Sequence, residues 1–297
     1  MSIRNVAKNT GDAIEQTARG AANQASPWVQ RLARLGYAAK GVIYIIIGML
    51  ALQAAFGPGG KTTDTRGALH TIATDGTGRF LLGIVALGLV GYALWRFVQA
   101  FFDPERKSEG QGIKGVVMRV GCFISGVIHA GLALTAFRLL TGIRGGGDGG
   151  GGTEAATATA LSQPLGQFWV LLAGVVVLGS AAYQIYKGWK EKFLRDLHTE
   201  AMNPAEMKAA TVTGKVGLIA RGIAFAIVGW FLLRAGFSGD AGEARGLDGA
   251  LVALAQQPYG PILLGLVAAG LVAYGGYCFV QSRWRHVPAV APAPAAA

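Results

Sequence analysis

Lys40, His129 and Arg221 are among the few ionisable side chains that lie inside long apolar stretches of the sequence. An ionisable group within a membrane segment is expensive to bury and marks a functional site by default. His129 could transfer a proton, and the two cations could hold an anion. His129 lies eight residues past Gly121, about 12 Å along a helix. Tyr44 takes the matching position in the first third of the chain, so these four residues are the candidate binding residues.

Each candidate also has a purely structural interpretation. A histidine can be hydrogen-bonded inside a helix bundle without handling protons. Lys40 and Arg221 each lie four residues past the glycine that opens their stretch. At that depth a long side chain can still reach the headgroups. The residues alone do not decide between the two interpretations.

The sequence lacks the residue sets of several membrane enzymes. Asp and Glu are absent from the apolar stretches, which argues against a carboxylate proton relay. Membrane haem usually takes paired axial ligands, but His129 is the one histidine there. No His-Glu-x-x-His zinc motif is present, and no acid stands near a Ser125–His129 or Ser180–His129 pair. Two thiols, Cys122 and Cys278, make no metal site. We therefore expect no enzyme activity, no cofactor and no metal site.

The elements that must position these residues are six apolar runs. The 297-residue chain is 52% hydrophobic and 14% charged, against about 25% charged in soluble domains. A bilayer core of about 30 Å needs about 20 apolar residues in a helix. The six runs, each near that length, are 35–56, 80–102, 116–140, 168–186, 213–236 and 261–282. We expect a multi-pass membrane protein.

The distribution of basic residues predicts the orientation of these spans. Of the 27 Lys and Arg residues, 20 lie in the terminal segments and in the loops on the same side. Bases in short loops favour the cytoplasmic side, so we expect both termini in the cytoplasm of a bacterial inner membrane. This topology accounts for the net charge of +11. It calls for anionic headgroups as partners rather than nucleic acid.

Small residues recur along all six runs. Each odd-numbered run has a base, a glycine seven residues on and a small residue seven further, which share one stripe of a helix. Each even-numbered run has a glycine that begins Gly-x3-Tyr-x2-aromatic. Small residues let a neighbouring backbone approach closely in a membrane. The positions predicted to pack helices are Gly41, Gly48, Gly88, Gly126, Ala133, Gly179, Gly222, Gly229 and Gly270.

Two aromatic residues follow each even-run glycine and approach the cytoplasmic surface. Tyr and Trp rings favour the headgroup region of a bilayer. The predicted interfacial anchors are Tyr92, Trp95, Tyr183, Tyr186, Tyr274 and Tyr277.

The third copy of the pattern carries a resemblance to a known family. Its residues are Ala220-Arg221-Gly222, Gly246-Leu247-Asp248-Gly249-Ala250-Leu251 and Gly270-Leu271-Val272-Ala273-Tyr274-Gly275. This stretch resembles the bacterial family catalogued as domain of unknown function 1206. The resemblance covers roughly residues 30–286 and implies a two-helix membrane unit that occurs three times. The second copy departs most, with Ser125 where the third has Arg221. The family implies no activity.

Together these patterns predict an all-α six-helix membrane bundle of three tandem two-helix repeats with pseudo-three-fold symmetry. The expected segments are a cytoplasmic N-terminal segment (1–28), repeats at 29–107, 114–194 and 212–286, a cytoplasmic linker (195–211) and a disordered tail (287–297).

Two functions are consistent with this architecture. One is a non-enzymatic scaffold or accessory protein that acts through lipid or a membrane protein partner. The other is a channel or transporter for a small solute or ion, with a path lined by Lys40, His129 and Arg221. The sequence leaves open the solute, the partner, the oligomeric state and whether the bundle axis is open.

Overall fold

The computed structural model describes residues 3–57, 62–74, 78–102, 112–142 and 152–286, and within them the chain is all-α. The long helices are α1 (Ile3–Phe56), α3 (Gly78–Phe102), α4 (Ile113–Thr141), α6 (Gly166–Trp189), α7 (Pro204–Ser238) and α9 (Gly260–Trp284). Short helices α2 (Thr65–Thr74), α5 (Gly152–Leu161) and α8 (Leu247–Ala255) precede α3, α6 and α9. The 3-10 helices are η1 (Lys192–Asp196), η2 (Thr199–Ala201) and η3 (Ala241–Glu243).

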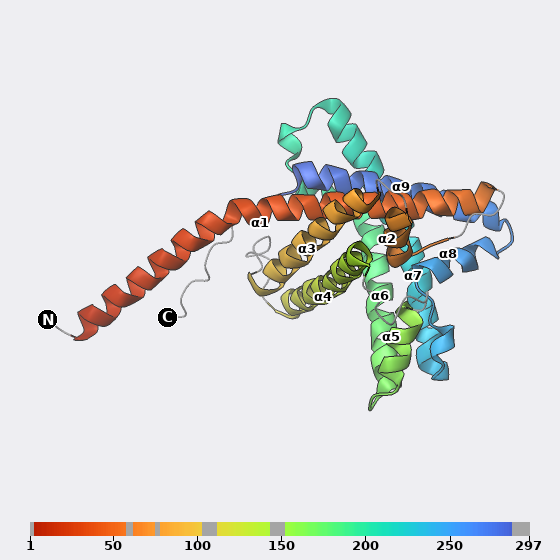
Figure 1. Ribbon diagram of the computed structural model, residues 1–297, viewed down its shortest axis with the longest axis horizontal. Coiled ribbons are helices and arrows are strands. Elements are labelled where there is room, and N and C mark those ends of the chain that lie inside the picture. The colour runs from red at the N-terminus through yellow and green to blue at the C-terminus, as the bar shows by residue number, and fades with distance from the viewer. Residues whose placement is uncertain (1–2, 58–61, 75–77, 103–111, 143–151, 287–297) are drawn as a thin grey trace.

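Six of these helices are long and apolar enough to cross a membrane, with mean hydropathies between 1.8 and 2.1. The predicted fold class, a six-helix membrane bundle, is confirmed. Helix α1 has 54 residues, about 80 Å at ~1.5 Å per residue, and continues through the boundary expected at residue 28. Figure 1 shows its N-terminal half projecting from the bundle. The predicted disordered tail, 287–297, lies outside the described residues.

The six spans form a ring that is open at one place. The most extensive contacts pair an even helix with the odd helix of the next repeat: α3 with α4, α6 with α7, and α9 with α1. Figure 1 shows α9 beside α1, and α6 beside α7 running across them. Helices α1 and α3 also pack together, as do α7 and α9. Among the described residues, α4 and α6 make no comparable contact, so the second repeat is open.

The small-residue stripe of each odd helix forms the contact between repeats. A methyl group on Gly41 would lie 2.9 Å from the carbonyl oxygen of Gly275 in α9. On Gly126 it would lie 2.8 Å from the Phe97 ring in α3, and on Gly222 it would lie 3.0 Å from a carbonyl in α6. The further stripe residues Gly48, Gly229 and Ala133 are also buried. These approaches require residues with little or no side chain.

The glycine of each even helix forms the contact within a repeat, and here the second repeat differs. A methyl group on Gly88 would lie 2.6 Å from the Ala39 Cβ, and one on Gly270 would meet Ala220. A methyl on Gly179 would meet nothing within 4 Å among the described residues. The predicted packing role of Gly179 is therefore wrong. The residue that matches Ala39 and Ala220 in the second repeat is Ile124, which is 47% exposed. Its branched side chain prevents the close crossing of helices that alanine allows.

The aromatic residues of the even helices also divide by repeat. Tyr92, Trp95, Tyr274 and Tyr277 are each less than 5% exposed. The prediction that these four are interfacial anchors is wrong, because their face packs inside the bundle. In the open second repeat, Tyr183 and Tyr186 are 48% and 45% exposed. The Tyr186 hydroxyl accepts a hydrogen bond from Lys192 Nζ at 2.7 Å.

Candidate functional site

Lys40 lies in the interior of the bundle rather than at its surface. Its side chain comes from α1 and the residue is 7% exposed. The ammonium Nζ donates to the Tyr92 hydroxyl of α3 at 3.3 Å and to the Tyr274 hydroxyl of α9 at 3.2 Å. It also lies 4.8 Å and 5.5 Å from the centres of these two rings. Lys40 is therefore held by two phenols from two different repeats.

Gly36 and Gly217 bring these tyrosines inward. A methyl group on Gly36 would lie 2.5 Å from the Tyr92 Cβ, and one on Gly217 would meet the Tyr274 backbone. Each tyrosine thus enters the bundle where the odd helix of its own repeat has no side chain. The matching pair in the second repeat does not form, because Tyr183 is exposed and a methyl group on Gly121 would have no neighbour within 4 Å in the described part of the chain.

Arg221 of α7 occupies the position in its repeat that Lys40 occupies in the first. Its Nε donates to the Tyr44 hydroxyl at 2.8 Å, and one terminal nitrogen donates to the side-chain Oε1 of Gln184 in α6. The guanidinium lies 4.3 Å from the Phe225 ring centre and 5.0 Å from that of Tyr274. Aromatic faces attract a cation at these distances.

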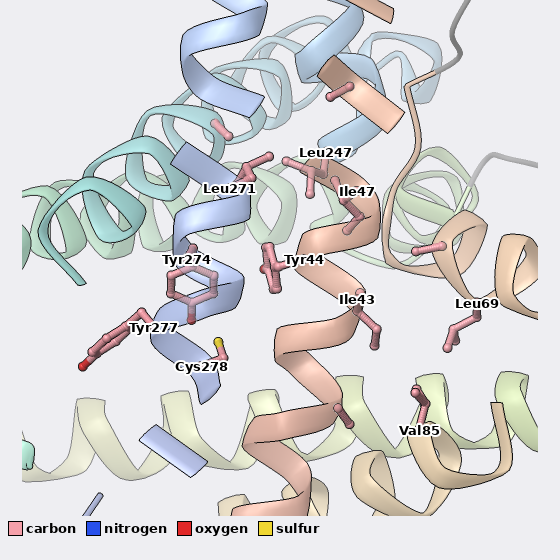
Figure 2. Close-up of a cluster of buried hydrophobic side chains, with 14 of the residues drawn as sticks. Ile43, Tyr44, Ile47, Leu69, Val85, Leu247, Leu271, Tyr274, Tyr277 and Cys278 are labelled. Atoms are coloured by element: carbon pink, nitrogen blue, oxygen red, sulfur yellow. The ribbon is translucent and has the colours of Figure 1, made fainter. Parts of the chain in front are cut away.

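Tyr44 and Tyr274 connect the two cations. Their ring centres are 4.7 Å apart in an edge-to-face arrangement. Figure 2 shows the two rings side by side between α1 and α9, above Tyr277 and Cys278. Tyr274 contacts both Lys40 and Arg221, while Tyr44 contacts Arg221. The two positive charges therefore belong to one network.

His129 of α4 joins this network through Tyr92. The ring centres of His129 and Tyr92 are 4.5 Å apart. The Nδ1 atom of His129 lies 2.7 Å from the Ser125 carbonyl oxygen. A carbonyl oxygen accepts only, so Nδ1 carries the proton and Nε2 of a neutral ring is left as an acceptor.

All six spans contribute to this arrangement, which we call the central cluster. Its members are Lys40, Tyr44, Tyr92, His129, Gln184, Arg221 and Tyr274. The structure thus brings the four candidate binding residues of the sequence together. Sequence reasoning missed Tyr92 and Tyr274 as cluster members because it placed them at the surface. Gln184 has no polar counterpart in the other repeats, so only its polarity within an apolar span could have identified it.

The central cluster holds positive charge without a neutralising acid. In the described part of the chain, the hydrogen-bond partners of Lys40 and Arg221 are phenols and an amide, none of them a carboxylate. Removing an ion from water costs several kcal/mol even after relaxation. Phenols and aromatic faces offset part of that cost but leave the net charge in place. Positive charge of this kind attracts anions.

A third cation extends the cluster toward the end of α3. The Arg96 guanidinium lies 5.2 Å from the Tyr92 ring centre, and it donates to Gln99 at 3.0 Å. Its Nε is buried and has no hydrogen-bond partner among the described residues. A buried donor without an acceptor costs about 1–3 kcal/mol. An anion or a water molecule at this atom would remove that cost.

The comparisons with known proteins agree with the three-repeat architecture. The sequence matches the family described as Domain of Unknown Function (DUF1206) over residues 35–103, 120–191 and 216–285. It is 36% identical over 264 residues to "Uncharacterized protein YxxB" of Bacillus subtilis (strain 168), covering 89% of this chain and 94% of that protein. No solved structure matches the chain.

Proposed function

We propose, starting from the fact that this chain belongs to the DUF1206 family, that it binds a small anion at the central cluster and carries it across the membrane. The observation that carries this proposal is the position of buried Lys40 and partly buried Arg221 beside phenols, with no carboxylate among their described hydrogen-bond partners. Cations buried within membrane segments commonly line substrate or ion pathways.

The donors of the cluster are suited to an anion. Each phenol that accepts from a cation still has its own O–H to donate. Lys40 uses two of its three N–H groups on tyrosines. An anion at the centre would therefore meet charged N–H donors and phenol O–H donors from several repeats. Hydrogen bonds in which one partner is ionised are roughly twice as strong as neutral ones.

We propose that the anion reaches this centre from the side of the open second repeat. Ser125 replaces the cation there, and α4 and α6 do not pack together as the matching helices of the other repeats do. His129 and Gln184 stand on these two helices and belong to the cluster. We place the route of the anion along this side of the bundle.

The surrounding topology is part of the proposal. We propose a bacterial cytoplasmic membrane as the location, both termini in the cytoplasm, anionic headgroups as lipid partners and no enzymatic step. The excess of bases in the terminal segments and alternate loops supports this orientation. A fluorescent protein fused to the C-terminus would fluoresce only if that terminus is in the cytoplasm. A fusion that is inserted in the membrane but does not fluoresce would contradict this orientation.

Flux into liposomes tests the transport proposal. Purified protein is reconstituted, and chloride or phosphate entry is followed with entrapped dyes for each anion. We expect flux in the native protein and its loss in the double variant Lys40→Met, Arg221→Met. Arg234→Met is the matched control, because Arg234 lies in the same helix as Arg221 but pairs with Glu243 outside the cluster. His129→Ala then shows whether a proton accompanies the anion.

Two results would refute this function. One is the absence of flux for chloride, phosphate and small carboxylates, together with no thermal stabilisation of the protein by any of them. The other is equal flux in the native protein and in a folded double variant, because the buried cations would then have no part in the path.

An accessory role is the second candidate, and the unpacked faces of α4 and α6 favour it. Their exposed apolar residues include Ile124, Ile128 and Val176, and a partner helix could pack there. A photo-crosslinking residue at position 124 should then join one membrane protein in cells. The control is position 237, where Phe237 is 75% exposed at the far end of α7. Lipid adducts alone at position 124 would count against this candidate.

A further inference from the structure

Two histidines far apart in the sequence lie together at the end of the bundle where α9 stops. His198 stands between η1 and η2, in the linker that joins α6 to α7, and His286 follows the end of α9. Their ring centres are 3.5 Å apart. None of the chemistry of the central cluster uses either residue.

The backbone holds these histidines in register. Leu197 and Arg285 form an antiparallel bridge. The His198 amide donates to the Trp284 carbonyl oxygen at 2.8 Å, and the His286 amide donates to the Asp196 carbonyl oxygen at 3.0 Å. The two rings therefore meet because main-chain hydrogen bonds fix the segments on which they stand.

A carboxylate completes the group. The Glu200 Oε1 atom lies 3.8 Å from the His198 Nδ1 atom. One ligand atom from each of His198, Glu200 and His286 can be chosen so that all three lie within 4.8 Å of one another. Two donors bound to one tetrahedral zinc ion lie about 3.4 Å apart, given bond lengths of about 2.1 Å. Small side-chain rotations can bring the three ligand atoms from within 4.8 Å of one another to this shorter separation. The Glu200 side chain is 75% exposed and can move.

The neighbouring charges leave the three ligands available. Asp196 pairs with Lys187 at 2.5 Å and with Arg285 at 3.9 Å. The Arg285 guanidinium lies 5.2 Å from the Tyr37 ring centre in α1. These cations are thus engaged by Asp196 and Tyr37, whereas Glu200 pairs with His198.

We propose that His198, Glu200 and His286 bind one first-row divalent transition-metal ion, with zinc as the ion to test. Two imidazoles and one carboxylate are ligands that zinc takes in proteins, with water in the remaining position. The bound ion fastens the α6–α7 linker to the end of α9. This site differs from the sequence-based expectation of no metal site, and it is independent of anion transport.

Zinc titration of the purified protein tests the proposal. The protein carries no polyhistidine tag, is stripped with a chelator and is titrated by calorimetry. We expect one zinc ion per chain at micromolar or lower concentration. His198→Ala and His286→Ala should each weaken binding at least about tenfold, because loss of a ligand exceeds the effect of a second-shell change. His70→Ala is the matched control, since His70 lies in α2 outside the site.

A second measurement reads the fastening of the linker. Trypsin can cut the linker at Lys192 and Arg195, and zinc should slow this cleavage in the native protein but not in the double variant His198→Ala, His286→Ala. His198→Gln is a second variant that keeps a polar side chain of similar size and so is less prone to misfold. A monodisperse peak in size-exclusion chromatography shows that each variant is folded. The proposal is overturned if zinc does not bind when it is in about 100-fold molar excess over the protein. It is also overturned if zinc binds the double variant as tightly as the native protein, or if bound zinc does not change the rate of cleavage.

Discussion

Alanine substitution at matched glycines measures the difference between the second repeat and its neighbours. Gly88, Gly179 and Gly270 occupy one position in the three repeats. An added methyl group would lie 2.6 Å from the Ala39 Cβ at Gly88 and would meet Ala220 at Gly270. At Gly179 it would have no neighbour within 4 Å among the residues that the structure describes. The same chemical change therefore meets a packed helix twice and open space once.

The expected magnitudes follow from these distances. Carbon atoms pack best at about 3.5–4.0 Å, so Gly88→Ala forces α1 and α3 apart by about 1 Å. Overpacking of this kind costs about 1–3 kcal/mol. Alanine also improves helix propensity by about 1 kcal/mol at any of the three sites. We expect Gly179→Ala to stabilise the protein by about 1 kcal/mol, and Gly88→Ala to range from neutral to about 2 kcal/mol destabilising.

The difference between two variants is more informative than either value. The propensity gain cancels between Gly88→Ala and Gly179→Ala, so their difference of about 1–3 kcal/mol isolates the steric term. Reversible unfolding of each variant in mixed detergent micelles gives the free energies. Ala39→Gly should relieve only the part of the clash in Gly88→Ala that comes from the Ala39 methyl group, because the added methyl still lies 2.9 Å from the Leu35 carbonyl oxygen. Glycine at position 39 also costs about 1 kcal/mol of helix propensity. If Gly179→Ala destabilises as much as Gly88→Ala, then α4 and α6 pack together and the open second repeat is refuted.

Two further predictions concern single hydrogen-bonding groups. Tyr92→Phe removes a hydroxyl that accepts from the buried Lys40, so we expect about 1–3 kcal/mol of destabilisation by the same unfolding assay. Tyr183→Phe at the matching exposed position should change stability by less than about 0.5 kcal/mol, and equal effects would contradict the assignment of Tyr92 to the cluster. Asn203 begins α7 with a capping box in which its side chain accepts from the Glu206 amide at 2.9 Å. Asn203→Ala should therefore cost about 1 kcal/mol, and no change in stability would show that this helix start does not need its cap.

Much of the fold could be predicted because the relevant signals are local. The length and composition of each apolar run set six spans, since a bilayer demands about 20 apolar residues whatever their neighbours are. The stripe through Gly41 and Gly126 could be assigned to packing from spacing alone. A glycine repeated every seven residues serves no purpose on a lipid-facing surface that any apolar side chain could fill.

The aromatic residues show where this reasoning stops. The spacing of Tyr92 and Trp95 gives their depth along the helix but not the direction in which that face points. A soluble helix reveals its buried face by hydrophobic periodicity. In a membrane span both the lipid side and the protein side are apolar, so that signal is weak. The sequence therefore predicted the wrong direction for these rings, which are buried in the bundle.

The sequence by itself determined the spans, the repeats and the presence of cations within the spans, because each depends on residues within one helix or on copies of one pattern. Only the tertiary structure decided which of these residues meet. Lys40 and Tyr274 contact each other across 234 positions, and His198 meets His286 through a backbone bridge. The sequence shows that the second repeat has Ile124 where the other repeats have alanine. Only the structure shows the effect, which is that Gly179 does not pack as Gly88 and Gly270 do. Contacts of this kind depend on how six helices close around one another, which no single segment encodes.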